Sequence, residues 1–230
     1  MEELLLQIPP KVSEEMNNSL IRPFMAEDVK GGLDAIGDFK APGSDGMTTL
    51  FYKKFWETVD EYITKEVLQF LNGGILPHDW NKTVIVLIPK VLNPESLKDL
   101  RPISLCNVLY KIASKVLASR LKVILPEIIS QNQSAFIPRR LITDNILVVH
   151  ELTHFLQNKR SGGDCFAALK LDMTKAYDRV EWHFLRWMME KMSFDSRWIN
   201  LIMQCVSTVS YKIKVNGELM EEIVPTRGLR

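Results

Sequence analysis

The stretch of residues 167–180 ends in a cluster of charged side chains that follows an apolar run. Residues 165–171 have the length and residue types of a buried β-strand, and Asp172 comes directly after them. A carboxylate at the end of a buried strand can hold a divalent metal ion, because the strand fixes its backbone and the strand end meets solvent. An Asp in this place can equally be a turn residue or a helix N-cap, so both interpretations stay open.

Charge is distributed unevenly along the 230 residues, although the formal net charge is only +1. Residues 1–80 carry 7 basic and 14 acidic side chains, residues 81–140 carry 10 and 3, and residues 141–230 carry 12 and 11. The basic middle segment can neutralise the phosphates of a nucleic acid. An ordinary solvated helix face would have the same composition, so charge alone does not decide between the two.

Other compositional features exclude several classes of protein. Hydrophobic residues make up 46% and charged residues 25%, as in a globular domain. The apolar runs are too short to cross a membrane, and acidic residues stand where a secretion signal would be basic, so we expect an intracellular protein of the nucleus or cytoplasm. The three cysteines are far apart and are expected to be buried reduced thiols.

Hydrophobic periodicity predicts a helix-rich α+β domain with a small antiparallel sheet. Helices are expected over residues 25–39, 51–72, 110–122, 144–159, 181–192 and 196–206. Strands are expected over residues 83–88 and 165–171, and Asn216-Gly217 predicts a hairpin over residues 211–224. Loops are expected over residues 91–102 and 131–140. Residues 1–24 have weak periodicity and are expected to be a linker or N-terminal arm, which leaves residues 25–230 as the domain.

Eight short motifs lie in an order and spacing by which the chain resembles the reverse transcriptase domain of non-LTR (LINE-type) retrotransposons. They occupy residues 41–46, 87–90, 101–105, 110–112, 133–138, 143–146, 171–180 and 227–230. The resemblance covers the chain from about residue 25 to its end. It implies a right-hand polymerase of which the fingers and the N-terminal part of the palm are present, without a thumb. It also implies an RNA template, a DNA primer and deoxynucleoside triphosphates as partners, and no protein partner is expected.

The resemblance implies a role for several individual side chains. Asp172 would be the first of three carboxylates that hold two Mg²⁺ ions, with the backbone carbonyl of Met173 as a neighbouring ligand. Tyr177 would lie beneath the sugar of the incoming nucleotide and exclude a 2′-hydroxyl by steric contact. Lys90 and Arg101 would face the triphosphate. The residues implied to contact the template strand are Gln133, Phe136, Arg139 and Arg140.

Each of these assignments has a plainer alternative. Tyr177 can be a packing aromatic, and Lys90 and Arg101 can be exposed solubilising charges. Arg139 departs from the family pattern, which commonly has a glycine at this place. The doubled arginine would therefore either strengthen a phosphate contact or distort the turn.

The chain ends at Arg230, where the family continues with Gln-Gly-Asp-Pro and later with a Tyr/Phe-Ala-Asp-Asp turn that supplies the other two carboxylates. One carboxylate cannot organise two divalent ions. The sequence therefore predicts an RNA-directed DNA polymerase domain that is inactive as this fragment. Two alternatives stay open, namely a non-catalytic module that binds RNA or an RNA–DNA hybrid, and the non-functional product of a decayed retroelement.

Overall fold

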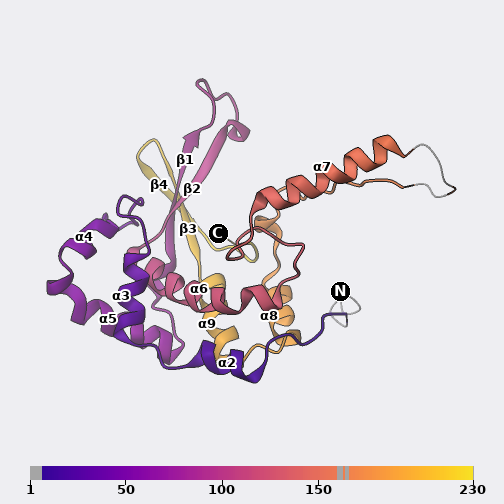
Figure 1. Cartoon of the computed structure of the whole chain (residues 1–230). Helices are drawn as coiled ribbons and strands as arrows, with labels where there is room; N and C mark the ends of the chain where they lie inside the picture. The colour runs from indigo at the N-terminus through magenta and orange to yellow at the C-terminus, as the bar shows by residue number, and fades with distance from the viewer. Residues whose placement is uncertain (1–6, 160–162, 164–165, 230) are drawn as a thin grey trace.

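A helical body and a four-stranded sheet make up most of the computed structural model, which describes residues 7–159, 163 and 166–229 (Figure 1). The helices are α2 (Glu14–Ile21), α3 (Ala26–Asp34), α4 (Thr49–Lys54), α5 (Trp56–Gly73), α6 (Val108–Ile128), α7 (Ile142–Asn158), α8 (Trp182–Lys191) and α9 (Ser196–Ser207). Short 3-10 helices are η1 (His78–Asn81), η2 (Leu97–Asp99) and η3 (Tyr177–Arg179). The strands are β1 (Lys82–Pro89), β2 (Leu100–Leu105), β3 (Ser210–Val215) and β4 (Glu218–Ile223).

The core is centred on α6, whose apolar side chains face α3 and α5. Ile112 and Val116 of α6 are fully or almost fully buried, as are Val29 and Leu33 of α3. Gly32 permits this close packing, because a Cβ there would lie 2.7 Å from the Val116 side chain. The periodicity of residues 110–122 therefore predicted this helix correctly, although α6 continues farther, to Ile128.

The helix expected over residues 51–72 is confirmed, but it begins as two pieces. α4 starts at Thr49 and breaks at Phe55, whose φ of −105° and ψ of 23° are not helical. α5 then buries Val67 and Phe70 on its inner face and ends at Gly73, with Gly74 as its C-cap. Gly74 adopts the left-handed conformation, with φ of 78°, that helix ends commonly require and that glycine accepts without steric cost.

The sheet has the strand order β2-β1-β3-β4 and is mixed, which corrects the expectation of an antiparallel sheet. β1 pairs antiparallel with β2 and parallel with β3. A parallel pair needs a long crossover, and here residues 90–209 provide one through several helices. The loop expected over residues 91–102 is shorter, because β2 already begins at Leu100. Pro102 is tolerated in β2 because this strand lies at the edge of the sheet.

The predicted hairpin of β3 and β4 is confirmed. Its two turn residues, Asn216 and Gly217, have φ of 50° and 90°. Positive φ at both positions is characteristic of the two-residue turn whose twist matches that of the two flanking strands. Asn-Gly is the pair of residues that adopts this turn most readily.

A strand was predicted over residues 165–171, but its described part, residues 166–171, forms none, and this is the largest error of the sequence-based fold. Residues 166–171 have no regular secondary structure, and Leu169 and Leu171 are 81% and 82% exposed. Cys165 lies outside the described residues. An apolar segment forms a buried strand only beside a strand that pairs with it, and β1 to β4 pair with one another instead.

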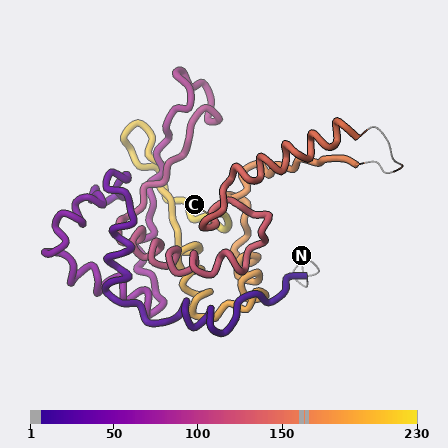
Figure 2. Tube along the Cα trace, in the orientation of Figure 1, coloured from indigo at the N-terminus to yellow at the C-terminus, as the bar shows by residue number. Residues whose placement is uncertain are grey.

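Helix α7 and the segment after it project together from the helical body (Figure 2). Phe166 packs against Phe155 of α7, with 5.9 Å between ring centroids, and Lys159 lies over the Phe166 ring. Ile146 and Val149 are about 60% exposed, although apolar residues on several sides of a helix usually indicate burial. None of the described helices has the length and apolar character needed to cross a membrane.

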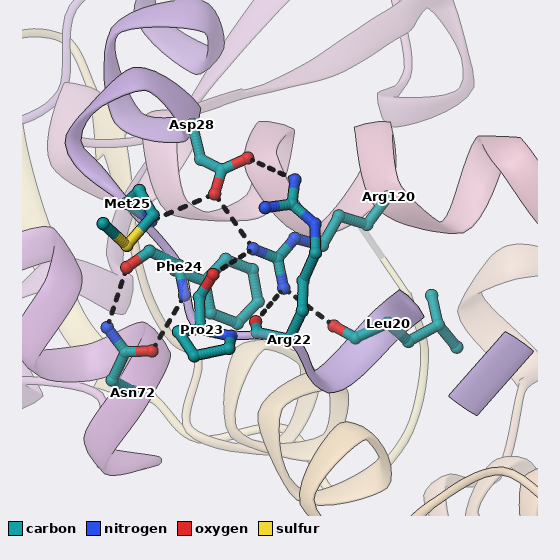
Figure 3. Close-up of polar contacts among 8 residues, drawn as sticks. All are labelled: Leu20, Arg22, Pro23, Phe24, Met25, Asp28, Asn72 and Arg120. Carbon is teal, nitrogen blue, oxygen red and sulfur yellow. Dashed lines mark hydrogen bonds and ion pairs between the residues drawn. The ribbon is translucent and has the colours of Figure 1, made fainter. Parts of the chain in front are cut away.

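The segment expected as an N-terminal arm contributes to the core. It contains α2, and Leu20 is 1% exposed within the main hydrophobic cluster. Asn72 of α5 fixes its end, because the Asn72 side chain accepts from the Phe24 N–H (3.0 Å) and donates to the Phe24 carbonyl (3.1 Å). Figure 3 shows this contact beside the guanidinium of Arg120.

The buried guanidinium of Arg120, on α6, binds the backbone between the last turn of α2 and the start of α3. Its Nη1 donates to the carbonyls of Leu20 (2.9 Å) and Arg22, and its Nη2 donates to the Pro23 carbonyl (3.0 Å). Nη2 also forms an ion pair with Asp28 at 2.9 Å, and the guanidinium lies 3.4 Å from the centre of the Phe24 ring. Only 6% of the Arg120 side chain is exposed, so these partners replace water at its two terminal nitrogens, Nη1 and Nη2.

The carboxylate of Asp28 has its pKa lowered from the ordinary value. Burial alone would raise this pKa, but the hydrogen bond from the Met25 N–H and the contact with Arg120 outweigh burial. Burial also lowers the pKa of Arg120, without consequence at neutral pH because a guanidinium remains charged. The pair is therefore ionic under physiological conditions.

Candidate functional site

Asp172 lies in an exposed segment between α7 and η3 rather than at the end of a strand. Its neighbour Met173 is 71% exposed. Within the described ranges, no group of three or more His, Cys, Asp or Glu side chains is placed to hold a metal ion. Asp172 thus offers one carboxylate, and this donor set does not fit a complete two-ion site.

Tyr177 begins η3, and the end of the chain holds its backbone. The Leu229 N–H donates to the Tyr177 carbonyl (2.9 Å), and the Gly228 N–H donates to the Val180 carbonyl (2.8 Å). Glu181 and Arg227 form an antiparallel bridge, reinforced by an ion pair at 3.3 Å. Motifs 171–180 and 227–230, which are some fifty residues apart in the chain, therefore meet, while the Tyr177 side chain remains 59% exposed.

Trp182 completes this contact, and the sequence analysis did not single it out. Its indole Nε1–H donates to the Gly228 carbonyl at 2.8 Å. Gly228 has φ of 94°, and a Cβ there would lie 3.1 Å from the Asp178 carbonyl oxygen. The sequence feature that could have indicated this role of Trp182 is its position shortly after the charged motif 171–180, where an indole N–H can donate to a neighbouring backbone carbonyl.

Replacing Gly228 with alanine is expected to loosen the segment that contains Tyr177. The left-handed backbone and the close Asp178 carbonyl both disfavour a Cβ. Trypsin cleavage after Lys175 and Arg179, followed by mass spectrometry, should become several-fold faster. Gly73→Ala is the matched control, because a Cβ on Gly73 meets no atom within 4 Å. Equal cleavage rates for the two variants would contradict this account of Gly228.

Lys90 and Arg101 lie on the hairpin of β1 and β2, which extends away from the helical body (Figure 1). Arg101 is exposed and stands opposite Ile88 of β1. The Lys90 N–H donates to the Asp99 carbonyl (2.7 Å), and its Nζ donates to the Lys98 carbonyl (2.6 Å). The hairpin thus places Lys90 directly after β1 and Arg101 in the neighbouring strand β2. The contacts that hold the Tyr177 backbone come instead from residues 228–229.

The hairpin tip has an internal polar anchor in Asp99. Its carboxylate accepts from the Ser96 N–H (3.0 Å), the Ser96 hydroxyl (3.1 Å) and the Glu95 N–H (3.2 Å). These hydrogen bonds, the Ser96 N–H foremost, lower the pKa of Asp99. The loop that carries Lys90 toward Arg101 is therefore ordered by its own side chains.

The four residues implied to contact template lie in the loop between α6 and α7. Gln133 is exposed and donates to the Ala135 carbonyl (3.4 Å). Phe136 is 81% exposed with φ of 65°, and Arg139 is exposed with φ of 64°. The guanidinium of Arg140 instead binds backbone carbonyls of its own loop and of α6.

The left-handed backbone at Arg139 explains why a glycine would suit this position. A non-glycine residue there costs on the order of 1 kcal/mol. Arg139→Gly is therefore expected to raise the free energy of unfolding by about 0.5–1 kcal/mol, measured by urea denaturation. Arg139→Lys, which keeps the Cβ, should leave it unchanged, and a stabilisation shared by both variants would contradict the backbone explanation.

Motif 41–46 packs against the start of α6. A Cβ on Gly43 would lie 2.0 Å from the Asn107 side-chain oxygen, so only glycine fits this contact. Lys111 donates to the Ala41 carbonyl (2.6 Å), and Asn107 donates to the Asp79 carbonyl (3.1 Å). The Lys111 hydrogen bond joins motif 41–46 to motif 110–112, and its two residues are 70 positions apart in the chain.

Comparison with known proteins adds two kinds of finding. A family model described as reverse transcriptase (RNA-dependent DNA polymerase) matches residues 88–230. An uncharacterized 149 kDa protein of transposon TX1 from Xenopus laevis is 31% identical over 221 residues, which are 96% of this chain and 17% of that protein. A probable RNA-directed DNA polymerase from transposon BS of Drosophila melanogaster is 30% identical over 167 residues, 71% of this chain and 18% of that protein.

A third relative shows the same relation to a known retroelement. The Pol polyprotein from the type-2 retrotransposable element R2DM of Drosophila melanogaster is 26% identical over 220 residues, 94% of this chain and 20% of that protein. The chain thus spans about a fifth or less of these three relatives. The family match and the relatives agree with the family that the order of the motifs indicated. The chain therefore belongs to the reverse transcriptase family, as a reverse transcriptase domain of a non-LTR retrotransposon.

Proposed function

We propose that this domain takes part in DNA synthesis on an RNA template within a polypeptide that supplies further catalytic carboxylates. The observation that carries the proposal is the family match over residues 88–230, which includes Asp172, Tyr177 and the segment that holds the Tyr177 backbone. Reverse transcriptases are in general Mg²⁺-dependent and act with a nucleic-acid template, a primer and nucleotides. Residues 25–230 would form the fingers and part of the palm.

The roles proposed for individual residues follow from the charge and shape of a nucleotide. Asp172 and the Met173 carbonyl would supply oxygen ligands, which are the donors that Mg²⁺ prefers. Lys90 and Arg101 would offset negative charge on the triphosphate. The exposed ring of Tyr177 would limit the room beside the sugar, which favours deoxynucleotides.

We further propose that residues 1–230 alone do not polymerise DNA, because the described residues offer Asp172 without the partners that two ions require. A non-catalytic RNA-binding role is the second candidate for the isolated chain. It is favoured by the excess of basic residues in the segment 81–140 and by the exposed aromatic Phe136. The product of a decayed element remains the third candidate.

A primer-extension assay on an RNA template tests the proposal for the isolated chain. With Mg²⁺ or Mn²⁺ and all four deoxynucleotides, we expect no incorporation above that of an enzyme-free control. Asp172→Ala serves as the matched variant and should behave identically. Metal-dependent extension by the unsubstituted chain that is lost in Asp172→Ala would overturn the proposal.

A further inference from the structure

Helix α7 and residues 166–173, which together form the α7 arm, project from the helical body (Figure 2). No residue of α7 is buried. Ile146, Leu147 and Val149 of the helix are all more than half exposed, as are Leu169 and Leu171 of the following segment. A monomeric protein rarely exposes so many neighbouring apolar side chains, and a patch of this kind indicates an interaction surface. The described part of the chain therefore does not supply the apolar cover that α7 needs.

The backbone of residues 166–171 is likewise unpaired. In the described part of the chain, no backbone hydrogen bond involves residues 166–175, and β1 to β4 pair only with one another. Leu169, Leu171 and Met173 alternate with the charged Lys170 and Asp172, which is the pattern of a strand with one apolar face. An unpaired segment of this pattern completes its hydrogen bonds when it pairs with a strand of another polypeptide.

The charges of this segment are complementary to those of a second copy of the same segment. Two copies that run antiparallel about a two-fold axis at Leu171 place Lys170 of each copy opposite Asp172 of the other. The same register places Leu169 opposite Met173, so apolar side chains also meet. Opposite charges across an antiparallel pair are stabilising, and like charges are destabilising.

Other registers lose this complementarity. An axis at Lys170 or at Asp172 would place two like charges opposite each other, and an axis at Leu169 would leave Lys170 without a charged partner. An axis between two residues would place apolar side chains opposite charged ones, because a shift by one residue exchanges the faces of a strand. The charges therefore select Leu171 as the centre of the pairing.

We propose that the α7 arm is the interface of a symmetric dimer, in which residues 167–174 of two copies pair as antiparallel strands about Leu171. A two-fold axis buries the same patch on both copies, so both Lys170–Asp172 ion pairs form. Because Phe166 packs against Phe155 and the helix projects together with this segment, the association also covers apolar side chains of α7. The dimer engages Asp172 and so withdraws this carboxylate from metal binding. It goes beyond the proposed function, because its formation requires neither metal nor nucleic acid.

Analytical ultracentrifugation of residues 1–230 over a series of concentrations, in EDTA and without nucleic acid, tests the dimer. We expect a reversible equilibrium between monomer and dimer. Lys170→Glu places two carboxylates opposite each other in both pairs, and Asp172→Lys places two ammonium groups there. Each substitution should weaken dimerisation about tenfold. Both side chains are exposed in the single chain, so circular dichroism should show that both variants are folded.

A mixture of the Lys170→Glu and Asp172→Lys variants tests the register itself. Each variant repels its own copy, but the mixed dimer has opposite charges at both pairs and should form as readily as the unsubstituted dimer. A single chain that carries both substitutions should also dimerise normally. Lys175→Glu is the matched control, because Lys175 would lie opposite Ala167, and it should change the affinity less than about twofold.

Cross-linking provides a second measurement that does not depend on charge. Leu171→Cys places a thiol on the two-fold axis, where opposite Cα atoms of antiparallel strands are about 4.5–5.5 Å apart, a distance that a disulfide spans. With oxidised glutathione, this variant should form a covalent dimer faster than Leu169→Cys, whose opposite residue is Met173. The unsubstituted chain measures any cross-linking through its own cysteines.

Several results would overturn the dimer. A chain that stays monomeric at every concentration would do so, including one whose arm binds only when a further polypeptide is added. Association that is unchanged in both Lys170→Glu and Asp172→Lys would show unspecific contact between apolar side chains, and the absence of a mixed dimer would exclude the register about Leu171. None of these results bears on the proposed polymerase function, because metal, template and nucleotide are all left out.

Discussion

Replacing Arg120 with alanine is expected to lower the free energy of unfolding by about 3–5 kcal/mol, a large part of the stability of a domain. The substitution removes the ion pair with Asp28 and three hydrogen bonds to backbone carbonyls, one in the last turn of α2 and two between α2 and α3. It also removes the flat guanidinium that lies on the Phe24 ring. The carbonyls and the carboxylate that lose their partner could be hydrated only if the contact between α2 and α6 opened. This requirement is the reason for the large loss of stability.

Urea denaturation measures this effect, and Arg22→Ala is its matched control. Arg22 pairs with the same Asp28 at 3.0 Å, but 53% of its side chain is exposed. An exposed ion pair contributes less than about 1 kcal/mol, so Arg22→Ala should be nearly neutral. Similar losses for the two variants would mean that charge, and not the buried hydrogen bonds, stabilises this region.

The same pair predicts a dependence on pH. The pKa of Asp28 is lowered in the folded chain, so its contribution to stability is complete above the unfolded pKa, near 3.8. That contribution is lost as the pH falls through the pKa of Asp28 in the folded chain, which is lower than its unfolded pKa. The difference in stability between the unsubstituted chain and Arg120→Ala should therefore shrink below about pH 4.

Removing the Asp172 carboxylate should have the largest effect on catalysis. The experiment uses a chimera in which this chain replaces the matching segment of the probable RNA-directed DNA polymerase from transposon BS, so that further catalytic carboxylates can be present. We expect the chimera to extend a primer on RNA, and Asp172→Ala to slow extension on the order of 10³-fold or more, because this carboxylate would help to hold the Mg²⁺ that supplies charge stabilisation at the reacting oxygens.

Asp178→Ala is the matched control for that experiment. It removes a carboxylate six residues farther along, next to the backbone contact that Gly228 makes. We expect a change of less than about tenfold, since Asp178 is not assigned to the metal site. Equal losses in the two variants would indicate that the segment is merely disturbed, and an active Asp172→Ala chimera would refute the metal-ligand assignment.

Local patterns in the sequence were sufficient to predict most of the elements. The spacing of apolar residues located α5 and α6, and Asn216-Gly217 located the hairpin of β3 and β4. These features depend on contacts between residues close in the chain, or on the φ preferences of single residues. The order of the motifs was likewise sufficient to indicate the reverse transcriptase family.

Tertiary structure decided what depends on partners far away in the chain. The apolar run before Asp172 has the pattern of a strand, but residues 166–171 do not pair with β1 to β4. The resemblance placed Arg140 among the template contacts, and the sequence singled out no role for Arg120. In the structure each of them binds backbone carbonyls that only the folded chain brings together. A guanidinium carries the same charge whether it stabilises the fold or binds a ligand at the surface. Burial and hydrogen bonds distinguish these two roles, and both arise only when the chain folds.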